Sequence, residues 1–175
     1  MTCTLASLSG LTLDCEVSRG GLKEVFIANW EATAATAIKA SLESATTTST
    51  VTAGTWYKYD FRRGGASMTS TLNVDDANGT NYVSTDLVLN FGRMNLKKWT
   101  EMKALSLNSL MAFVVDSNGE KYFLGLDEPV VASAGQGETG AAKSDSNAYT
   151  ITLQANDDTY PYVWVGQVPT EQNNS

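Results

Sequence analysis

The chain has 175 residues and a formal net charge of −7; 42% of the residues are hydrophobic, 18% are charged and none is histidine. This length fits one domain that buries roughly 70% of its unfolded surface, so a real core is possible. An acidic chain gains nothing from counterion release, which argues against specific nucleic-acid binding. The lack of histidine removes the commonest general base and zinc ligand, so we expect neither an enzyme nor a cofactor.

The sequence carries no signal for a membrane or for export. No apolar run approaches the length of a membrane span, and the first residues lack the basic and apolar segments of a signal peptide. Cys3 and Cys15 lack CxxC spacing and suit buried or free thiols in a reducing compartment, although their separation also allows a loop-closing pair. The acidity either aids solubility or keeps nucleic acid from adhering to a surface along which it slides.

The first third of the chain predicts an arm, one strand and a region of low complexity. Residues 1–21 form an N-terminal arm, and residues 22–28 (LKEVFIA) predict a strand. Residues 31–44 are rich in alanine and allow a short helix. Residues 45–55 are mostly Thr and Ser, which predicts a flexible loop or a strand that orders on assembly.

A long β-hairpin is predicted over residues 55–91, with too little apolar surface to be stable alone. Apolar residues alternate along parts of it, and Asn78-Gly79 supplies a turn. A two-stranded ribbon is marginal in water without a further packing face, so we expect it to pair with a neighbouring copy. Shortening it between Met68 and Leu87 is then expected to leave a folded monomer that forms no rings. The candidate inter-subunit residues are Trp56, Tyr57, Tyr59, Phe61, Arg62, Arg63, Leu72 and Val74.

The second half predicts a helix followed by a β-hairpin. The segment 95–107 begins with Asn95, a suitable N-cap, and carries an apolar stripe at helical spacing. Asn118-Gly119 separates two apolar runs (LMAFVVD and KYFLGL), which is the strongest short-range hairpin signal. The stripe consists of Leu96, Trp99, Met102 and Leu105.

The C-terminal third predicts a loop, two strands and a tail. Residues 127–145 are rich in Gly, Ala and Ser and suit a loop, and residues 149–153 alternate as in a half-exposed strand. Residues 160–165 (YPYVWV) predict a last strand, and residues 167–175 a flexible tail. With about seven strands and one helix, the expected class is mainly β: an antiparallel β-sandwich or barrel with one flanking α-helix and a long β-hairpin.

Two patterns resemble catalytic or nucleotide sites. Asp75-Asp76 and Asp157-Asp158 are carboxylate pairs, but adjacent residues in a turn point apart, which favours solvated turns over glycoside hydrolysis. Residues 135–144 (GQGETGAAKS) resemble a phosphate loop, but two alanines separate the lysine from the preceding glycine. We therefore expect a surface loop without a nucleotide.

A third pattern is the Arg62-Arg63 doublet, which follows an aromatic run (WYKYDF). Such a cluster stacks single-stranded nucleic acid or carbohydrate, and the same composition marks protein–protein hot spots. On an acidic β protein we favour the protein–protein interpretation. A carbohydrate-binding β-sandwich that uses Trp56, Tyr57 and Tyr59 as a platform is the alternative.

The order of these pieces resembles a known family. GGLKEVFIANW is followed by a Thr-rich stretch, a ribbon from YKYDF to NFGRMN, one helix, AFVVDSNGEKYFLGLDEP, a Gly-rich loop and SNAYTITLQANDDTYPYVWV. From residue 22 to residue 165 this order is similar to that of virion structural proteins of tailed bacteriophages, in particular tail-tube subunits. The opening also resembles structural proteins of phages that infect Bacteroidetes.

The resemblance implies a β-sandwich or barrel flanked by a helix, with a long hairpin that reaches the next ring. It implies hexameric rings stacked around an electronegative lumen, with residues 45–55 and 55–91 as the inter-subunit parts. The expected partners are further copies of the chain, other virion proteins and DNA that passes without specific binding, and no membrane. The expected location is the virion tail, after synthesis in the cytoplasm of the bacterial host. A head decoration protein, a neck ring and a tail terminator share this composition and fold class and stay open as alternatives.

Overall fold

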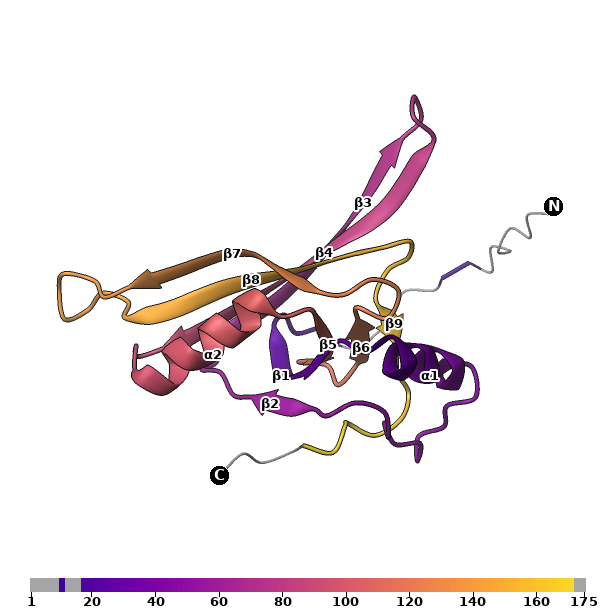
Figure 1. Cartoon of the computed structure of the whole chain (residues 1–175), viewed down its shortest axis with the longest axis horizontal. Coiled ribbons are helices and arrows are strands. Elements are labelled where there is room, and N and C mark those ends of the chain that lie inside the picture. Colours follow the sequence, from indigo (N-terminus) through magenta and orange to yellow (C-terminus); the bar gives the residue numbers. More distant parts are fainter. Residues whose placement is uncertain (1–9, 12–16, 172–175) are drawn as a thin grey trace.

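The computed structural model describes residues 10–11 and 17–171, and Figure 1 shows their arrangement. Within these residues the chain forms nine strands and two helices, which confirms the predicted mainly β class with a helix on its flank. In chain order they are β1 (Leu22–Asn29), α1 (Ala32–Leu42), β2 (Tyr57–Tyr59), β3 (Ala66–Asp75), β4 (Thr80–Gly92), α2 (Leu96–Leu107), β5 (Leu110–Asp116), β6 (Lys121–Leu124), β7 (Val131–Glu138), β8 (Ala148–Asp157) and β9 (Tyr162–Val163).

The strands form two antiparallel sheets that pack against each other. We call the sheet with strand order β2-β1-β5-β6-β9 the inner sheet and the sheet with order β3-β4-β8-β7 the ribbon sheet. Alternate side chains of both sheets enter one apolar core, in which Val25, Leu87 and Leu153 are fully buried. Neither sheet closes on itself, so the fold is the sandwich and not the barrel of the two predicted alternatives.

The central strand of the inner sheet, β5, is covered on both faces. Ala112 and Val114 face the ribbon sheet, whereas Met111 and Phe113 face a second apolar cluster beneath α1. The Ala-rich segment is indeed a helix, and it contributes Ile38 and two alanines to this cluster. Burial on both faces explains why β5 is a continuous apolar run instead of an alternating one.

The Thr/Ser-rich segment 45–55 packs on the same cluster. It contains no strand in the single chain, and a strand that orders on assembly stays a prediction. Val51 is only 8% exposed, and Ala45 and Ala53 pack against the cluster. A segment that is polar on average therefore still contributes core residues, because its few apolar side chains all point inward.

The predicted hairpin over residues 55–91 is partly wrong. β2 pairs with β1 in the inner sheet, with Tyr59 opposite Val25. A turn at Arg62, closed by the Gly65 N–H on the Arg62 carbonyl at 2.7 Å, then carries the chain across to the ribbon sheet. The true hairpin is β3–β4, paired from Ala66↔Leu89 to Asp75↔Thr80.

The predicted loop over residues 127–145 is also wrong in part, because β7 occupies its middle. β7 pairs with β8 from Val131↔Gln154 to Glu138↔Ala148. Gly137 allows a close approach there, since a Cβ at this position would lie 2.9 Å from Cε1 of Tyr149. Of the glycines that suggested a phosphate loop, Gly135 and Gly137 are thus residues of an edge strand, and Gly140 lies in the loop that follows it.

The helix α2 begins as predicted but presents a different face to the core. The Asn95 Oδ1 accepts the Lys98 N–H at 2.9 Å, which confirms the N-cap. Leu105 is buried and Met102 packs on the core, whereas Leu96 is 78% exposed and Trp99 50% exposed. The predicted four-residue stripe is therefore wrong at its first half, because α2 touches the sandwich only along one narrow side.

Both ends of the described chain are tied to the body by hydrogen bonds. The Arg19 N–H donates to Asn118 Oδ1 at 2.8 Å, beside the turn between β5 and β6. The Gln167 N–H donates to the Ser49 carbonyl at 2.7 Å, so the predicted tail is anchored at its start. Cys3, Cys15, most of the predicted arm and residues 172–175 lie outside the described residues.

Candidate assembly surface

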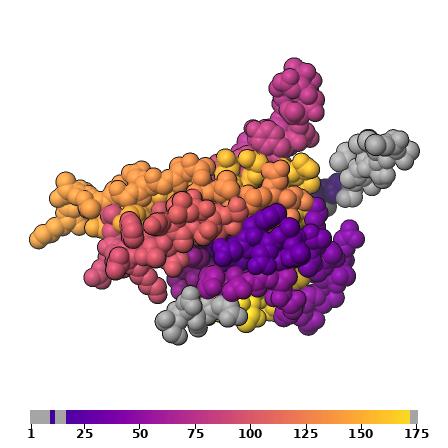
Figure 2. All heavy atoms as spheres, viewed as in Figure 1, coloured from indigo at the N-terminus to yellow at the C-terminus, as the bar shows by residue number. Residues whose placement is uncertain are grey.

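The far end of the β3–β4 hairpin extends beyond the rest of the ribbon sheet. β8 accompanies β4 only as far as the pair Val83↔Asp157, whereas β3 and β4 continue for three more pairs, from Asn73↔Tyr82 to Asp75↔Thr80. Figures 1 and 2 show this end standing clear of the body of the molecule. We call residues 73–82 the hairpin tip.

The hairpin tip and its base expose apolar side chains. Leu72 is 45% exposed, Val74 59% and Tyr82 43%. Leu72 and Val74 continue the row of β3 side chains that begins with the buried Ala66 and faces the inner sheet. They are exposed because the inner sheet does not extend that far. The row of apolar side chains on β3 therefore extends past the end of the buried core.

The turn of the hairpin tip is ordered by Asp75. Its Oδ1 accepts the Ala77 and Asn78 N–H groups at 3.0 and 3.3 Å, and the Asn78 side-chain amide donates to Oδ2 at 2.6 Å. The hydrogen bonds from Asn78 and Ala77 lower the pKa of Asp75. Gly79 has a φ of 64°, the left-handed conformation that the predicted turn requires. The first carboxylate pair is thus a solvated turn, in which only Asp75 has a structural role.

The ribbon sheet has two edges without a pairing partner. In the described part of the chain, β3 and β7 each bond to a strand on one side only. β3 contains no charged residue or proline between Ala66 and Val74, and the one charge of β7 is Glu138 at its end. Monomeric proteins usually protect such edges with charges, prolines or very short strands. Both edges therefore leave backbone groups without a strand partner, although the pairing of β7 with β8 is irregular between Ala132 and Ala134.

The outer face of the ribbon sheet, which points away from the inner sheet, is polar but almost uncharged. Asn90 donates to the Thr150 hydroxyl at 3.0 Å, and the Gln154 amide donates to Ser84 and Asp86 at 3.1 and 3.0 Å. These residues alternate with core residues along each strand. The central residues of this face are Ser67, Thr69, Thr71, Ser84, Asp86, Val88, Asn90, Thr150, Thr152 and Gln154, of which only Asp86 is charged.

The predicted inter-subunit residues fall into separate places. Leu72 and Val74 lie at the base and in the tip of the hairpin, and Arg62 and Arg63 are exposed at the opposite end of the ribbon sheet. Trp56 is only 1% exposed, with its ring against Phe123 at 5.9 Å between centroids. The structure therefore removes Trp56 from the candidate interface, because a fully buried side chain has no surface to offer a neighbour.

The three aromatic residues of the carbohydrate platform do not lie together. Trp56 belongs to the cluster beneath α1, whereas Tyr59 packs against the core between the sheets. Trp56 and Tyr59 thus point to opposite faces of the inner sheet, and Tyr57 lies on the side of Tyr59 because strand residues alternate. Phe61 is also half-buried, with its ring 5.2 Å from Phe91. The sequence placed these residues in one cluster because it did not reveal which face each would take.

Tyr57 and Tyr59 instead line an open groove of about 690 Å³ between β2 and α2. The Tyr59 hydroxyl donates to Glu101 Oε2 at 2.9 Å, and burial, followed by the Glu101 charge, raises the pKa of Tyr59. Glu101 was not among the residues that the sequence singled out. The amphipathic pattern of α2 alone contains no signal for this contact, because the partner comes from the other sheet.

Asp157, at the end of β8, is a buried carboxylate whose hydrogen bonds come from the backbone of Glu128 and Gly125. Its side chain is 8% exposed, and Oδ1 accepts the Glu128 N–H at 3.4 Å. Desolvation, with a smaller effect of the Asp127 charge, raises the pKa of Asp157. Asp157, the first residue of the second carboxylate pair, is therefore buried and does not lie in a solvated turn. This corrects the sequence-based interpretation of the pair.

Asp157→Asn is expected to increase the melting temperature at pH 7 and to have a smaller effect at pH 4. A raised pKa means that the folded state holds the Asp157 proton more tightly than the unfolded chain. The free energy of unfolding therefore falls as the pH rises from the ordinary aspartate value through the raised one. Thermal denaturation at the two pH values measures the effect, with the exposed neighbour Asp158→Asn as the control. A lower melting temperature for Asp157→Asn at pH 7 would contradict this account.

No protein-family model, curated protein or solved structure matches the chain. Neither helix of the described residues is long and apolar enough to cross a bilayer. Within those residues, no group of three or more acidic or cysteine side chains is placed to hold a metal ion.

Proposed function

We propose that this protein is a structural subunit of a tailed-phage virion, a tail-tube protein whose copies form stacked hexameric rings around a DNA-conducting lumen. The observation that carries the proposal is the ribbon sheet, which has two edges with few charges and no proline, a nearly uncharged outer face and a hairpin that extends beyond the apolar core. Its role is assembly and not catalysis.

The strand order supports ring closure. The ribbon sheet has four strands in an antiparallel series, so its two edge strands, β3 and β7, run in opposite directions. When a second copy is added by rotation, its β3 lies antiparallel to β7 of the first copy. Repetition of this contact gives one continuous antiparallel sheet, and a ring that closes leaves no free edge.

The outer face of the ribbon sheet suits the lining of a lumen. Six copies of four strands, at about 4.8 Å per strand, enclose a channel roughly 37 Å across between backbones even before strand tilt widens it. The central outer-face residues include no lysine or arginine and only one carboxylate, Asp86. Such a surface forms no ion pairs with phosphates, so DNA would slide along it without being held.

The test is disulfide formation between the two edges. Within one copy, β3 and β7 are three strand spacings apart, roughly 14 Å, whereas a disulfide requires Cα atoms within about 7 Å. Ser67→Cys is combined in turn with Ala134→Cys and Gln136→Cys, in a chain with Cys3 and Cys15 changed to Ser. We expect covalent ladders up to six subunits on a non-reducing gel, and rings or tubes by electron microscopy.

The matched control combines Ser67→Cys with Glu43→Cys, which is exposed beyond the end of α1 and lies on neither edge. This variant is expected to give no ladder. A strictly monomeric wild-type chain at high concentration, with no ladder in either edge variant, would overturn the proposal. Rings that never lengthen into tubes would instead favour a tail terminator or neck ring, which use the same closed sheet as a single layer.

A further inference from the structure

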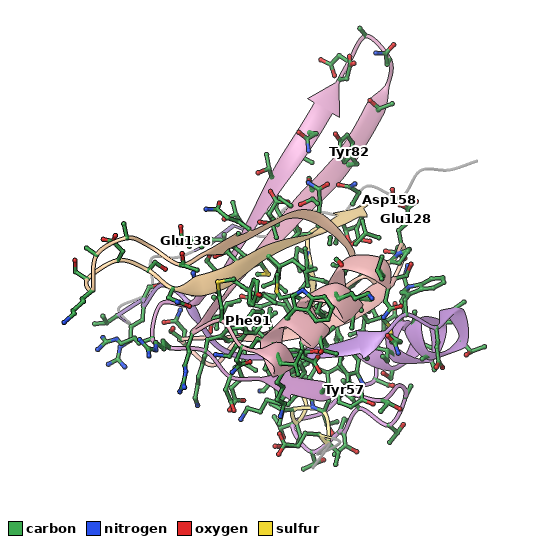
Figure 3. All side chains as sticks on the ribbon, turned by 60° about the vertical axis from the view of Figure 1, so that its left-hand side comes forward. Tyr57, Tyr82, Phe91, Glu128, Glu138 and Asp158 are labelled. Carbon is green, nitrogen blue, oxygen red and sulfur yellow. The ribbon has the colours of Figure 1, made fainter. Side chains whose placement is uncertain are left out.

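The hairpin end of the ribbon sheet is acidic, whereas the opposite end gathers arginines beside two carboxylates, Glu138 and Asp145. At one end, Asp75 and Asp76 lie in the hairpin tip, and Glu128 and Asp158 lie near the base of the hairpin, close to Tyr82 (Figure 3). At the other end, where β3 begins and β4 ends, lie Arg62, Arg63 and Arg93, three of the four arginines in the chain. A chain with a net charge of −7 thus gathers its arginines at one place.

Arg62 and Arg93 border a shared depression at this end. Arg62 lies over the backbone of Gly92, with its Nε 3.5 Å from the point that a Cβ at Gly92 would occupy. Arg93 follows directly, in a left-handed conformation with a φ of 63°. The depression has a volume of about 500 Å³ and is completed by residues 144–147 of the β7–β8 loop and by Ala148 at the start of β8. We call it the arginine depression.

These arginines have no carboxylate partner among residues 10–11 and 17–171. None of their side chains lies within 4.0 Å of an acidic group of a described residue. Asp145 borders the depression, but its Oδ2 already accepts the Ala141 and Ala142 N–H groups at 2.8 and 2.7 Å. The positive charge is therefore available to an acidic group from outside.

We propose that the hairpin tip of one copy docks on the arginine depression of a copy in the next ring, with Asp76 facing the arginines. This inference rests on the proposed function and names the contact that stacks the rings. The two surfaces lie at opposite ends of the same strands, so a copy displaced along the strand direction brings one against the other. The contact is head-to-tail and does not close, which is the symmetry that produces a tube from rings.

Apolar surface supports the same contact. Val74 and Leu72 form an exposed row behind the tip, and Leu96, 78% exposed, lies three residues after Arg93. A docked tip would bury these side chains and desolvate the ion pairs, which strengthens charge attraction relative to water. Ion pairs between an arginine guanidinium and a carboxylate also fix orientation, because the guanidinium offers a planar set of donors.

The test is a charge exchange, with Asp76→Lys on the tip and Arg62→Glu in the depression. Asp76 is chosen because Asp75 holds the turn, whereas Asp76 makes no side-chain hydrogen bond within the described residues. Each single variant is expected to form rings of unchanged mass and to need about tenfold more protein, or higher, to form tubes, a factor that corresponds to about 1.4 kcal/mol. The double variant is expected to regain tubes, because it restores opposite charges across the contact.

Glu43→Lys and Lys23→Glu make the same charge changes at exposed positions away from both surfaces, and both variants are expected to form tubes normally. Tube formation is measured by sedimentation and electron microscopy, and ring mass by native mass spectrometry. Single variants that form tubes like the wild type, or a double variant that stays impaired, would overturn the inference while the rings persist. If Arg62→Glu only abolished binding of a duplex oligonucleotide, the depression would belong to a phosphate instead. A wild-type chain without rings would remove the proposed function and this inference together.

Discussion

A chain in which residues 73–82 are replaced by Asn-Gly is expected to fold like the wild type and to form rings but no tubes. Leu72 and Val83 are directly opposite each other, so a two-residue turn joins them without a change of register. The removed residues lie beyond the last β4–β8 pair, and none of them is buried. The loss is therefore confined to the hairpin tip, which the proposed stacking contact requires.

The measurement pairs thermal denaturation with electron microscopy of the concentrated protein. A change of only a few degrees in the melting temperature, together with rings that do not lengthen, is the expected result. Tubes of normal length would show that the tip has no part in stacking. A longer deletion, between Met68 and Leu87, serves as a contrast: it removes the buried Val83 and Thr85 and is expected to unfold the chain, contrary to the expectation from sequence.

Trp56→Ala is expected to lower the free energy of unfolding by about 3–5 kcal/mol, the usual cost of truncating a large buried aromatic residue. The Trp56 ring lies 6.4 Å from that of Phe113 and 5.9 Å from that of Phe123, and its Nε1 donates to the Ala53 carbonyl at 2.8 Å. Truncation leaves a cavity in the cluster beneath α1 and loosens the segment that crosses it. Such a loss is a large share of the stability of a typical domain, roughly 5–15 kcal/mol.

Urea denaturation at a protein concentration too low for assembly measures this effect. Tyr57→Ala is the matched control: Tyr57 is next in sequence and only half-buried, so a loss of about 1 kcal/mol is expected. A Trp56→Ala variant with unchanged stability that failed to assemble would restore Trp56 to the interface. If Trp56 is a core residue, the Trp56→Ala variant is less stable than the wild type but still forms rings at temperatures where it is folded.

Local sequence signals predicted several elements well because their causes are local. Asn95 caps α2 through its own side chain, and Asn118-Gly119 joins β5 and β6 as expected. Such features depend on backbone conformations and on side chains within a few residues. The turn at the hairpin tip, with Gly79 in a left-handed conformation, belongs to the same group.

The predictions failed where a distant partner decides the outcome. β7 was missed because glycine and alanine form a strand there only when Tyr149 and the rest of β8 lie alongside. β2 has the same aromatic alternation as a hairpin strand, but it pairs with β1, which lies about thirty residues earlier. In each case the residues are compatible with a strand, and pairing with a neighbouring strand (β8 for β7, β1 for β2) stabilises it.

The candidate surfaces show the same difference between what local sequence determines and what distant partners determine. The sequence by itself determined that this is a mainly β protein with few charges, no histidine and a polar β-hairpin. Only the tertiary structure decided that Trp56 is buried, that β3 and β7 are open edges, and that the arginines gather opposite the acidic tip. The physical reason is that composition and alternation describe one strand at a time. The edges, faces and charged ends of a sheet depend on which strands pair with each other.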